Sequence, residues 1–245
     1  MTEELKRIEQ LEKEIKKLKG LNENNIPIYS FSKIKIEELE SLVDIEKSYD
    51  LTTFDTWFNN RHTISLEDIE FLKNLIDINI LLISDYHEED LKVNFIVPLI
   101  SKVNFFMLKD KIRSFYHEPL RYETENFIFN GNADFIVSNG LRKATKPYFF
   151  IQEFKKGKVN TDPEPQLLAE LISAVELNNK KFMRGAYIIG AIWNFVILEK
   201  LEKNKYQYFV SQNFDSTKIE DLKEIYKNLI FVKNEIIDMV KNEKL

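Results

Sequence analysis

The sequence predicts an α/β fold in which a helix, three strands, a second helix and further strands follow one another. Three observations predict it. The stretch Pro147–Lys155 is an aromatic and aliphatic run of strand length that ends in charged residues. Apolar runs between Tyr122 and Val137 provide two more strands. Asp162 and Pro163 then form an N-cap and a first-turn proline, which open a helix to about residue 178.

Two segments are predicted to precede this core. In residues 2–20 the apolar positions are spaced 3-4-3, which is typical of a short coiled coil and predicts a homodimer or higher oligomer; these positions are Ile8, Leu11, Ile15 and Leu18. The alternative is a helix that folds back on its own domain. We therefore divide the chain into a coiled-coil helix (1–25), a helical N-terminal region without recognisable chemistry (26–85) and an α/β domain (86–245). Ser65 is predicted to cap a helix of the second region.

Within the α/β domain, a helix is expected from Glu88 to Met107, kinked at Pro98. Asn130-Gly131 is typical of a hairpin turn and divides Tyr122 to Val137 into two strands, and Asn139-Gly140 offers a second turn. The helix after Asp162 is expected to carry Gln166 and Glu170 on its polar side. Three short strands (185–192, 193–198 and 206–210) and a closing helix (216–241) complete the prediction.

Charged side chains in the predicted strands indicate a cation site. Alternation along a strand places Glu153 and Lys155 on one face and Phe154 on the other. Asp134 lies inside the preceding apolar run, where a carboxylate is costly to bury without a partner. If the strands are neighbours, Asp134 and Glu153 can supply oxygen ligands to a divalent cation, with Lys155 beside it. The alternative is a surface ion pair, because carboxylate-x-lysine triplets are common in a chain with 31% charged residues.

The pattern Gly131-Asn132-Ala133-Asp134 followed by Glu153-Phe154-Lys155 resembles the PD-(D/E)XK nuclease superfamily, over roughly residues 85–240. The resemblance implies a restriction-endonuclease-like core of helix, three strands, helix and strand, with an N-terminal helical extension here. It implies hydrolysis of phosphodiester bonds, most of all in DNA, and a role in restriction or defence. Asp134, Glu153 and the Phe154 carbonyl would then hold Mg²⁺, for which Mn²⁺ can substitute.

The resemblance implies two further site residues. Glu88 opens a helix and a basic residue, Lys92, follows four positions later, which is similar to the first helix of restriction-type members. The alternatives are the adjacent Glu89, or a carboxylate that only favours the helix start. Gln166 corresponds to a glutamine that reaches the active site or the DNA. Some members carry a tyrosine four residues later, where this chain has Glu170.

Charge is distributed unevenly along the chain. The net charge is −5, but residues 102–184 contain fourteen Lys and Arg against ten Asp and Glu. A locally basic face is compatible with phosphate binding. We predict phosphate contacts from the basic residues that flank the site in sequence, namely Arg142, Lys143, Lys146, Lys156, Lys158 and Arg184.

Composition excludes several classes of protein. The chain has no cysteine and three scattered histidines, which excludes disulfides and thiolate zinc sites and argues against a histidine-rich metal site. Its charged beginning and the lack of a long apolar run predict a cytoplasmic protein without a membrane partner. Two functions remain: a metal-dependent nuclease, or a catalytically inactive nuclease-like fold that binds nucleic acid or serves in assembly.

Overall fold

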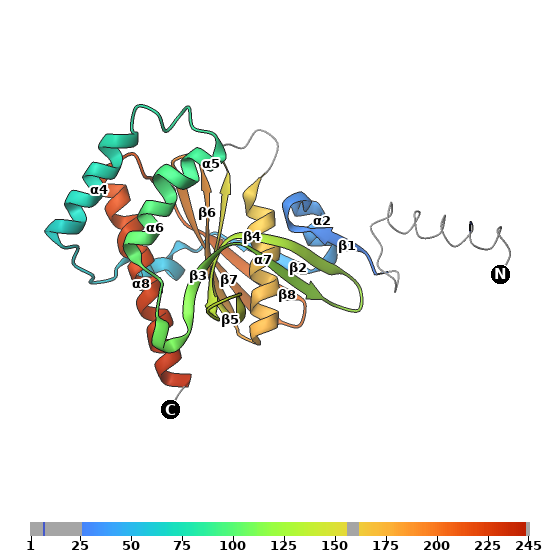
Figure 1. Cartoon of the computed structure of the whole chain (residues 1–245). Helices are drawn as coiled ribbons and strands as arrows, with labels where there is room; N and C mark the ends of the chain where they lie inside the picture. Colours follow the sequence, from blue (N-terminus) through green and yellow to red (C-terminus); the bar gives the residue numbers. More distant parts are fainter. Residues whose placement is uncertain (1–6, 8–25, 156–161, 244–245) are drawn as a thin grey trace.

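The computed structural model describes residue 7 and residues 26–155 and 162–243, and these form a mixed α/β fold around one large sheet (Figure 1). Its strands are β1 (Ile28–Ser30), β2 (Asp44–Ser48), β3 (Ile112–Glu123), β4 (Ile128–Asn139), β5 (Thr145–Lys155), β6 (Phe182–Ile189), β7 (Ile192–Glu202), β8 (Lys205–Val210) and β9 (Phe214–Asp215). Its longer helices are α2 (Ile36–Leu42), α4 (Leu66–Asn79), α6 (Val97–Val103), α7 (Pro163–Asn178) and α8 (Ile219–Glu243). The predicted coiled coil falls outside the described residues.

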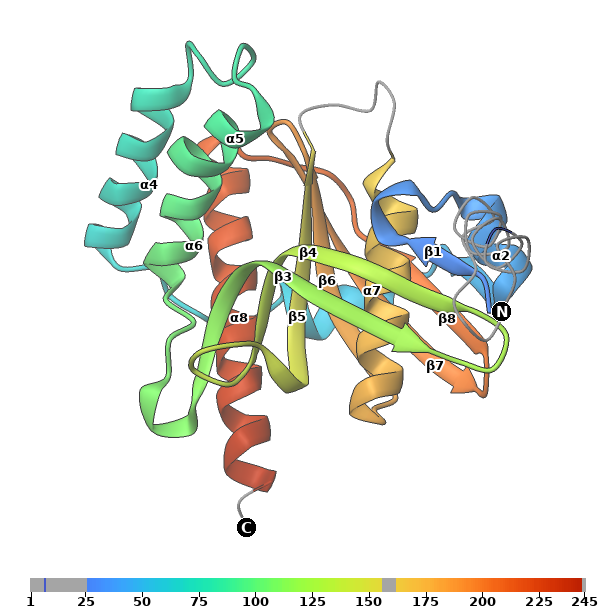
Figure 2. The ribbon, with the colours of Figure 1, turned by 45° about the vertical axis from the view of Figure 1, so that its right-hand side comes forward.

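The sheet has the order β1-β4-β5-β6-β7-β8-β2, with β3 also paired to β4 and β9 to β7. The chain forms an antiparallel β3-β4-β5 meander, crosses through α7 and returns as β6, which is parallel to β5. Such a crossover requires a helix on one face of the sheet. α7 and α2 cover that face, and α4, α6 and α8 cover the other (Figures 1 and 2).

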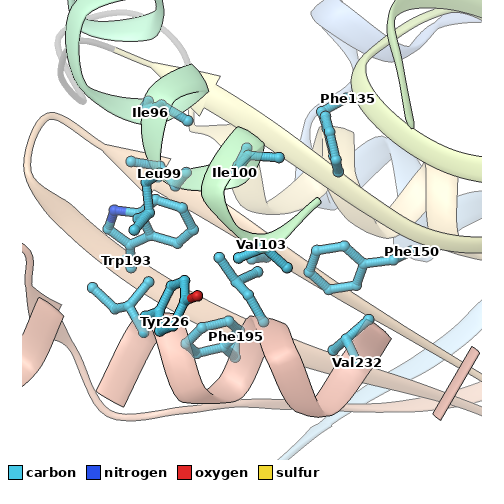
Figure 3. Packing of buried hydrophobic residues seen from close by; sticks show 14 of the residues in the cluster. Ile96, Leu99, Ile100, Val103, Phe135, Phe150, Trp193, Phe195, Tyr226 and Val232 are labelled. Atoms are coloured by element: carbon cyan, nitrogen blue, oxygen red, sulfur yellow. The ribbon is translucent and has the colours of Figure 1, made fainter. Parts of the chain in front are cut away.

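Each face of the sheet has its own apolar core. In the first core, on the face covered by α4, α6 and α8, Trp193 and Phe195 of β7 pack with Phe150 of β5 against α6 and α8 (Figure 3). In the second core, on the face covered by α7 and α2, helix α7 is buried along most of its length by the sheet and by residues 31–45. Because α7 is buried nearly all round, almost every side chain on it must either pack or find a polar partner.

The helix predicted from Glu88 is interrupted. It consists of α5 (Glu88–Leu91), a π-helical turn η3 (Lys92–Ile96) and α6, and it ends at Val103 instead of Met107. Pro98 lies in the first turn of α6, where its missing N–H leaves the Asn94 carbonyl without an α-helical donor. The side-chain amide of Asn79 lies 3.4 Å from that carbonyl. The interruption of the helix is the π-turn at Lys92–Ile96, which precedes Pro98, and the kink expected at Pro98 itself stays a prediction.

The hairpin predicted at Asn130-Gly131 is wrong, because both residues lie inside β4. The chain turns instead at residues 124–127, where the Thr124 hydroxyl accepts from the Phe127 N–H at 2.9 Å. Gly131 has a packing role, since a Cβ there would lie 2.8 Å from Cδ2 of Phe31. The second predicted turn is confirmed, and Gly140 adopts φ +104°, a conformation that favours glycine.

Residues 26–85 are not a separate helical region, which corrects the prediction. β1 pairs with β4 and β2 pairs with β8, so this segment joins the sheet at two places and crosses α7 between them. The pattern-based prediction missed both strands because β1 has three residues and β2 contains a single apolar residue, Ile45. The predicted cap is confirmed, since the Ser65 hydroxyl accepts from the Asp68 N–H at the start of α4.

The carboxyl-terminal third of the chain follows the prediction closely. Asp162 caps α7 by accepting from the Glu164 N–H, and Pro163 begins the helix, which ends at Asn178. β6, β7 and β8 are the three predicted strands, although the β6–β7 turn lies at Gly190, two residues before the predicted break. The closing helix α8 runs from Ile219 to Glu243.

Candidate active site

The site lies where one edge of β4 changes its partner. β3 pairs with β4 along nearly its full length and therefore occupies one edge. The other edge is shared, because β1 pairs with residues 128–130 and β5 with residues 135–139. Residues 131–134 lie in the gap between these two partners. A point where strands separate leaves backbone groups and space for a ligand, as at the switch points of other α/β sheets.

Asp134 occupies this gap and is held on both sides of its carboxylate. Its Oδ2 accepts from the Phe154 N–H at 3.0 Å, in place of the backbone acceptor that β4 no longer provides. Its Oδ1 lies 3.6 Å from Nζ of Lys92, whose side chain is only 12% exposed. Nζ of Lys92 also lies 5.5 Å from the centre of the Phe154 ring. Asp134 is thus fixed between the end of β5 and the π-turn.

Glu153 and Lys155 lie side by side on the α7 face of β5, as strand alternation predicts. Nζ of Lys155 donates to Oε1 of Glu153 at 2.5 Å, and the Glu153 side chain is fully buried. The alternative of a surface ion pair is therefore wrong. Oε2 of Glu153 is buried and has no hydrogen-bond partner among the described residues.

α7 contributes a second buried carboxylate. Nε2 of Gln166 donates to Oε1 of Glu170 at 3.1 Å, while Oε2 of Glu170 has no partner in the described part of the chain. Both residues had been predicted on a polar face, but Gln166 is 5% exposed and Glu170 is fully buried. The helix has no solvated face at this position, so its polar residues point to the site instead.

Both candidate glutamates on α5 relate to residues of the site. The charge of Glu88 contributes to raising the pKa of Lys155. Glu89 is 78% exposed at its side chain, and its Oε1 lies 3.7 Å from Nζ of Lys92. The site therefore combines residues from α5, the π-turn, β4, β5 and α7, which meet at one end of the sheet (Figure 2).

Burial and crowding of carboxylates shift the acidities at this site. Burial, and then the neighbouring Asp134 carboxylate, raise the pKa of Glu153 to about 8. Burial, and then the charge of Glu153, raise the pKa of Glu170 well above its usual value. Burial would lower the pKa of Lys155, but Glu153, Asp134 and Glu88 outweigh it and raise the pKa. Lys155 consequently stays protonated while the carboxylates compete for protons.

The donors at this site fit a hard divalent cation. Buried carboxylate oxygens without partners are costly unless a proton or a cation satisfies them, and Glu153 and Glu170 each present one. The Phe154 carbonyl points to the same strand edge as its N–H, and hence toward Asp134. Across the described ranges, no three His, Cys, Asp or Glu residues lie close enough together to hold a metal. Backbone and water oxygens would have to complete the coordination.

The basic residues predicted to bind phosphate are not gathered at the site. Arg142, Lys143 and Lys146 are exposed at the opposite end of β5, and at about 3.3 Å per residue Lys146 lies roughly 23 Å from Glu153. Lys156 and Lys158 fall outside the described residues. Proximity in sequence was a poor guide here because a long strand separates its two ends.

Arg184 belongs to the core of the opposite face and not to the site. Its guanidinium makes two hydrogen bonds to Glu235, at 2.8 and 2.9 Å, and lies 4.8 Å from the Trp57 ring. Its side chain is 11% exposed. On β6, Ala186 and Ile188 share its face and pack in the first core, whereas Glu153 faces α7.

We expect Arg184→Met to lower the free energy of unfolding by about 2 kcal/mol, because it leaves the Glu235 carboxylate half-buried without its partner. Denaturant unfolding measures this loss. Arg121→Met is the matched control, since the Arg121–Glu123 pair is about half exposed and should cost under about 0.5 kcal/mol. If the two variants lose equal stability, the structural role of Arg184 is wrong.

Lys92 and Glu170 are the site residues that the sequence did not identify by itself. Lys92 had appeared only through its spacing from Glu88, and Glu170 only as a residue on the polar side of its helix and as a departure from a family pattern. A usable signal was present for Glu170, because it lies in the run Leu167 to Val175, where nearly every other residue is apolar.

Compared with known proteins, the chain matches no protein-family model and has no significant match among curated sequences. Among the described residues, no helix combines the length and apolarity that crossing a membrane requires.

Proposed function

We propose that the protein is a metal-dependent nuclease of the PD-(D/E)XK type that hydrolyses phosphodiester bonds, with DNA as its substrate. The observation that carries the proposal is the meeting of Asp134, Glu153 and Lys155 at the gap that β1 and β5 leave along the edge of β4. Carboxylates and a lysine placed together in this way suit hydrolysis assisted by Mg²⁺ or Mn²⁺.

The order of elements also supports the proposal. The α6-β3-β4-β5-α7-β6 order, with an antiparallel meander and a parallel fourth strand, is that expected of a restriction-endonuclease-like core. The resemblance in sequence rests on short motifs spread over roughly residues 85–240, and this order of elements involves most of residues 97–189. Fold alone does not define an activity, so the activity has to follow from the chemistry of the site.

The residues have distinct roles in the proposed reaction. Asp134, Glu153 and the Phe154 carbonyl would hold a divalent cation, which when bound stabilises charge on the phosphate and acidifies a water molecule. Lys155 keeps its charge and places an ammonium group where negative charge develops on the phosphate. Lys92 fixes the orientation of Asp134 at 3.6 Å. Gln166 fixes the orientation of Glu170, and the charge of Glu88 contributes to raising the pKa of Lys155.

A direct assay tests this function. Purified protein is incubated with plasmid, linear duplex, single-stranded DNA and RNA in Mg²⁺, in Mn²⁺ or in chelator. We expect cleavage of DNA that requires the added metal. A protein that binds Mn²⁺ but cuts none of these substrates would contradict the proposal.

Lys155→Met should lower the cleavage rate by about 100-fold, because it removes a preorganised positive charge from the site. Calorimetry should still detect Mn²⁺ binding, since both carboxylates remain. Lys200→Met is the matched control: Lys200 pairs with Glu176 at 2.8 Å, near the other end of α7. Lys200→Met should lose about as much stability as Lys155→Met and keep the wild-type cleavage rate. Equal rates in the two variants would exclude a role for Lys155 in the reaction.

The alternative function is a nuclease-like fold that has kept its architecture for nucleic-acid binding or assembly without catalysis. Unpartnered buried carboxylates favour the enzyme, because a binding module gains nothing from their cost. Cytoplasmic location and a homodimer formed through residues 1–25 stay predictions. Light scattering of the full chain and of a chain lacking residues 1–20 tests the dimer, which a monomeric full-length chain would exclude.

A further inference from the structure

A groove of about 490 Å³ opens beside the candidate active site, between the segment that follows β1 and the start of α7. Its size lies within the range of roughly 300–1,000 Å³ that small-molecule sites occupy. The floor is mainly apolar and includes Ile34 and Pro165, both of them buried. The segment leaves the edge of β4 at Ser30, just before the gap that contains Asp134. The groove and the gap are therefore neighbours.

Gln166 links the groove to the carboxylates. It lines the groove, is 5% exposed, and donates through Nε2 to Glu170. No donor from the described residues lies within hydrogen-bond distance of its Oε1. The charge of Glu153 contributes to raising the pKa of Glu170. A ligand in the groove would thus contact the buried Gln166 amide, which is hydrogen-bonded to Glu170, a carboxylate of the candidate active site.

Two lysines stand on the rim. Lys33 and Lys35 are exposed, line the groove, and have no ion pair with any described carboxylate. Asp162 also lines the groove, but its carboxylate accepts from the Glu164 N–H as the cap of α7. Glu37 is the second acidic group of the lining. The two lysines and two carboxylates of the lining cancel in formal charge, so phosphate contacts here would come from the position of the lysine side chains at the rim and not from a net positive charge.

We propose that this groove binds one nucleotide of the substrate strand, adjacent to the phosphate that is cut. This inference rests on the proposed function and assigns a role to residues 31–37. The base lies on the apolar floor with a polar edge toward Gln166, and Lys33 and Lys35 contact the phosphates that flank it. The N-terminal segment thereby extends the substrate site beyond the α/β core.

The test measures binding without metal, by fluorescence anisotropy of labelled single-stranded and duplex DNA and of RNA of the same sequence. Lys33→Ala/Lys35→Ala should weaken binding of single-stranded DNA at least tenfold, and its salt dependence should become shallower by roughly 1.4 units of slope. The matched control is Lys143→Ala/Lys146→Ala, at the far end of β5, which should leave affinity and slope unchanged. Ser32→Trp, which fills the groove without removing charge, should weaken binding and leave the slope unchanged.

The outcomes separate the groove from the catalytic proposal. If the wild type cuts DNA but the Lys33/Lys35 variant binds like the Lys143/Lys146 control, the groove proposal is overturned and the nuclease stands. If the groove variants lose DNA binding while the wild type cuts no nucleic acid in Mg²⁺ or Mn²⁺, the groove proposal is supported and the nuclease proposal is wrong. Tight binding by Ser32→Trp also overturns the groove, and a wild type that neither binds nor cuts any nucleic acid overturns both.

Discussion

Asp134→Asn and Glu153→Gln should each reduce metal-dependent cleavage by at least about 1,000-fold. Each substitution keeps the shape of the side chain and removes one negative charge from the place where a cation would bind. A loss of about 4 kcal/mol in stabilisation of the transition state corresponds to that factor. Calorimetric titration with Mn²⁺ should show weaker binding in both variants, measured on protein whose folding is confirmed by thermal unfolding.

Glu176→Gln is the control for these variants. Glu176 is also a largely buried carboxylate on the sheet-facing helix α7, but it pairs with Lys200 and Tyr206 away from the site. We expect it to lose stability and to retain cleavage. Cleavage near the wild-type rate in either Asp134→Asn or Glu153→Gln would contradict the assignment of the site.

The second large effect concerns stability against pH in the absence of metal. Between its ordinary pKa of 4.5 and its raised pKa of about 8, Glu153 holds a proton in the folded state that it gives up when the chain unfolds. The folded state then binds more protons, so the free energy of unfolding falls as pH rises through this window. The slope reaches at most about 1.4 kcal/mol per pH unit for one group, and Glu170 acts in the same direction.

Glu170→Gln should therefore flatten this profile, and at pH 8 to 9 it should be more stable than the wild type while near pH 5 the two differ little. Denaturant unfolding in chelator at intervals between pH 5 and 9 measures the curves. Added Mn²⁺ should stabilise the wild type more at pH 8 than at pH 5, because a cation binds the deprotonated carboxylates. Parallel curves for wild type and Glu170→Gln would show that this carboxyl does not titrate as described.

The part of the site that sequence predicted best is the part governed by local rules. Alternation fixed the relation of Glu153 to Lys155, and an N-cap with a proline fixed the start of α7. These patterns depend only on neighbours within a few residues. The placement of Asp134 beside β5 also followed, because consecutive strands usually pair.

The failures have a common origin in contacts between distant segments. Asn130-Gly131 has the composition of a turn, but the glycine allows the close approach of Phe31, which lies in the 3₁₀ turn after β1, a hundred residues earlier. Gln166 and Glu170 were placed on a polar side of α7 because nothing local shows that residues 31–45 cover this helix. Arg184 was predicted to bind phosphate because its actual partner, Glu235, lies far away in sequence, on the last helix.

The crossing of α7 by the N-terminal segment has a consequence for the order of folding. Every residue of the proposed catalytic centre lies between positions 88 and 170, but β2, which anchors the far end of the segment, pairs with β8 near residue 205. Contacts of such long sequence separation form late, because closing a long loop is entropically costly. During synthesis the carboxylates can assemble before β8 exists, whereas the wall of the groove stays unanchored at β2. On the ribosome, the catalytic residues would thus come together before the nucleotide-binding groove is complete.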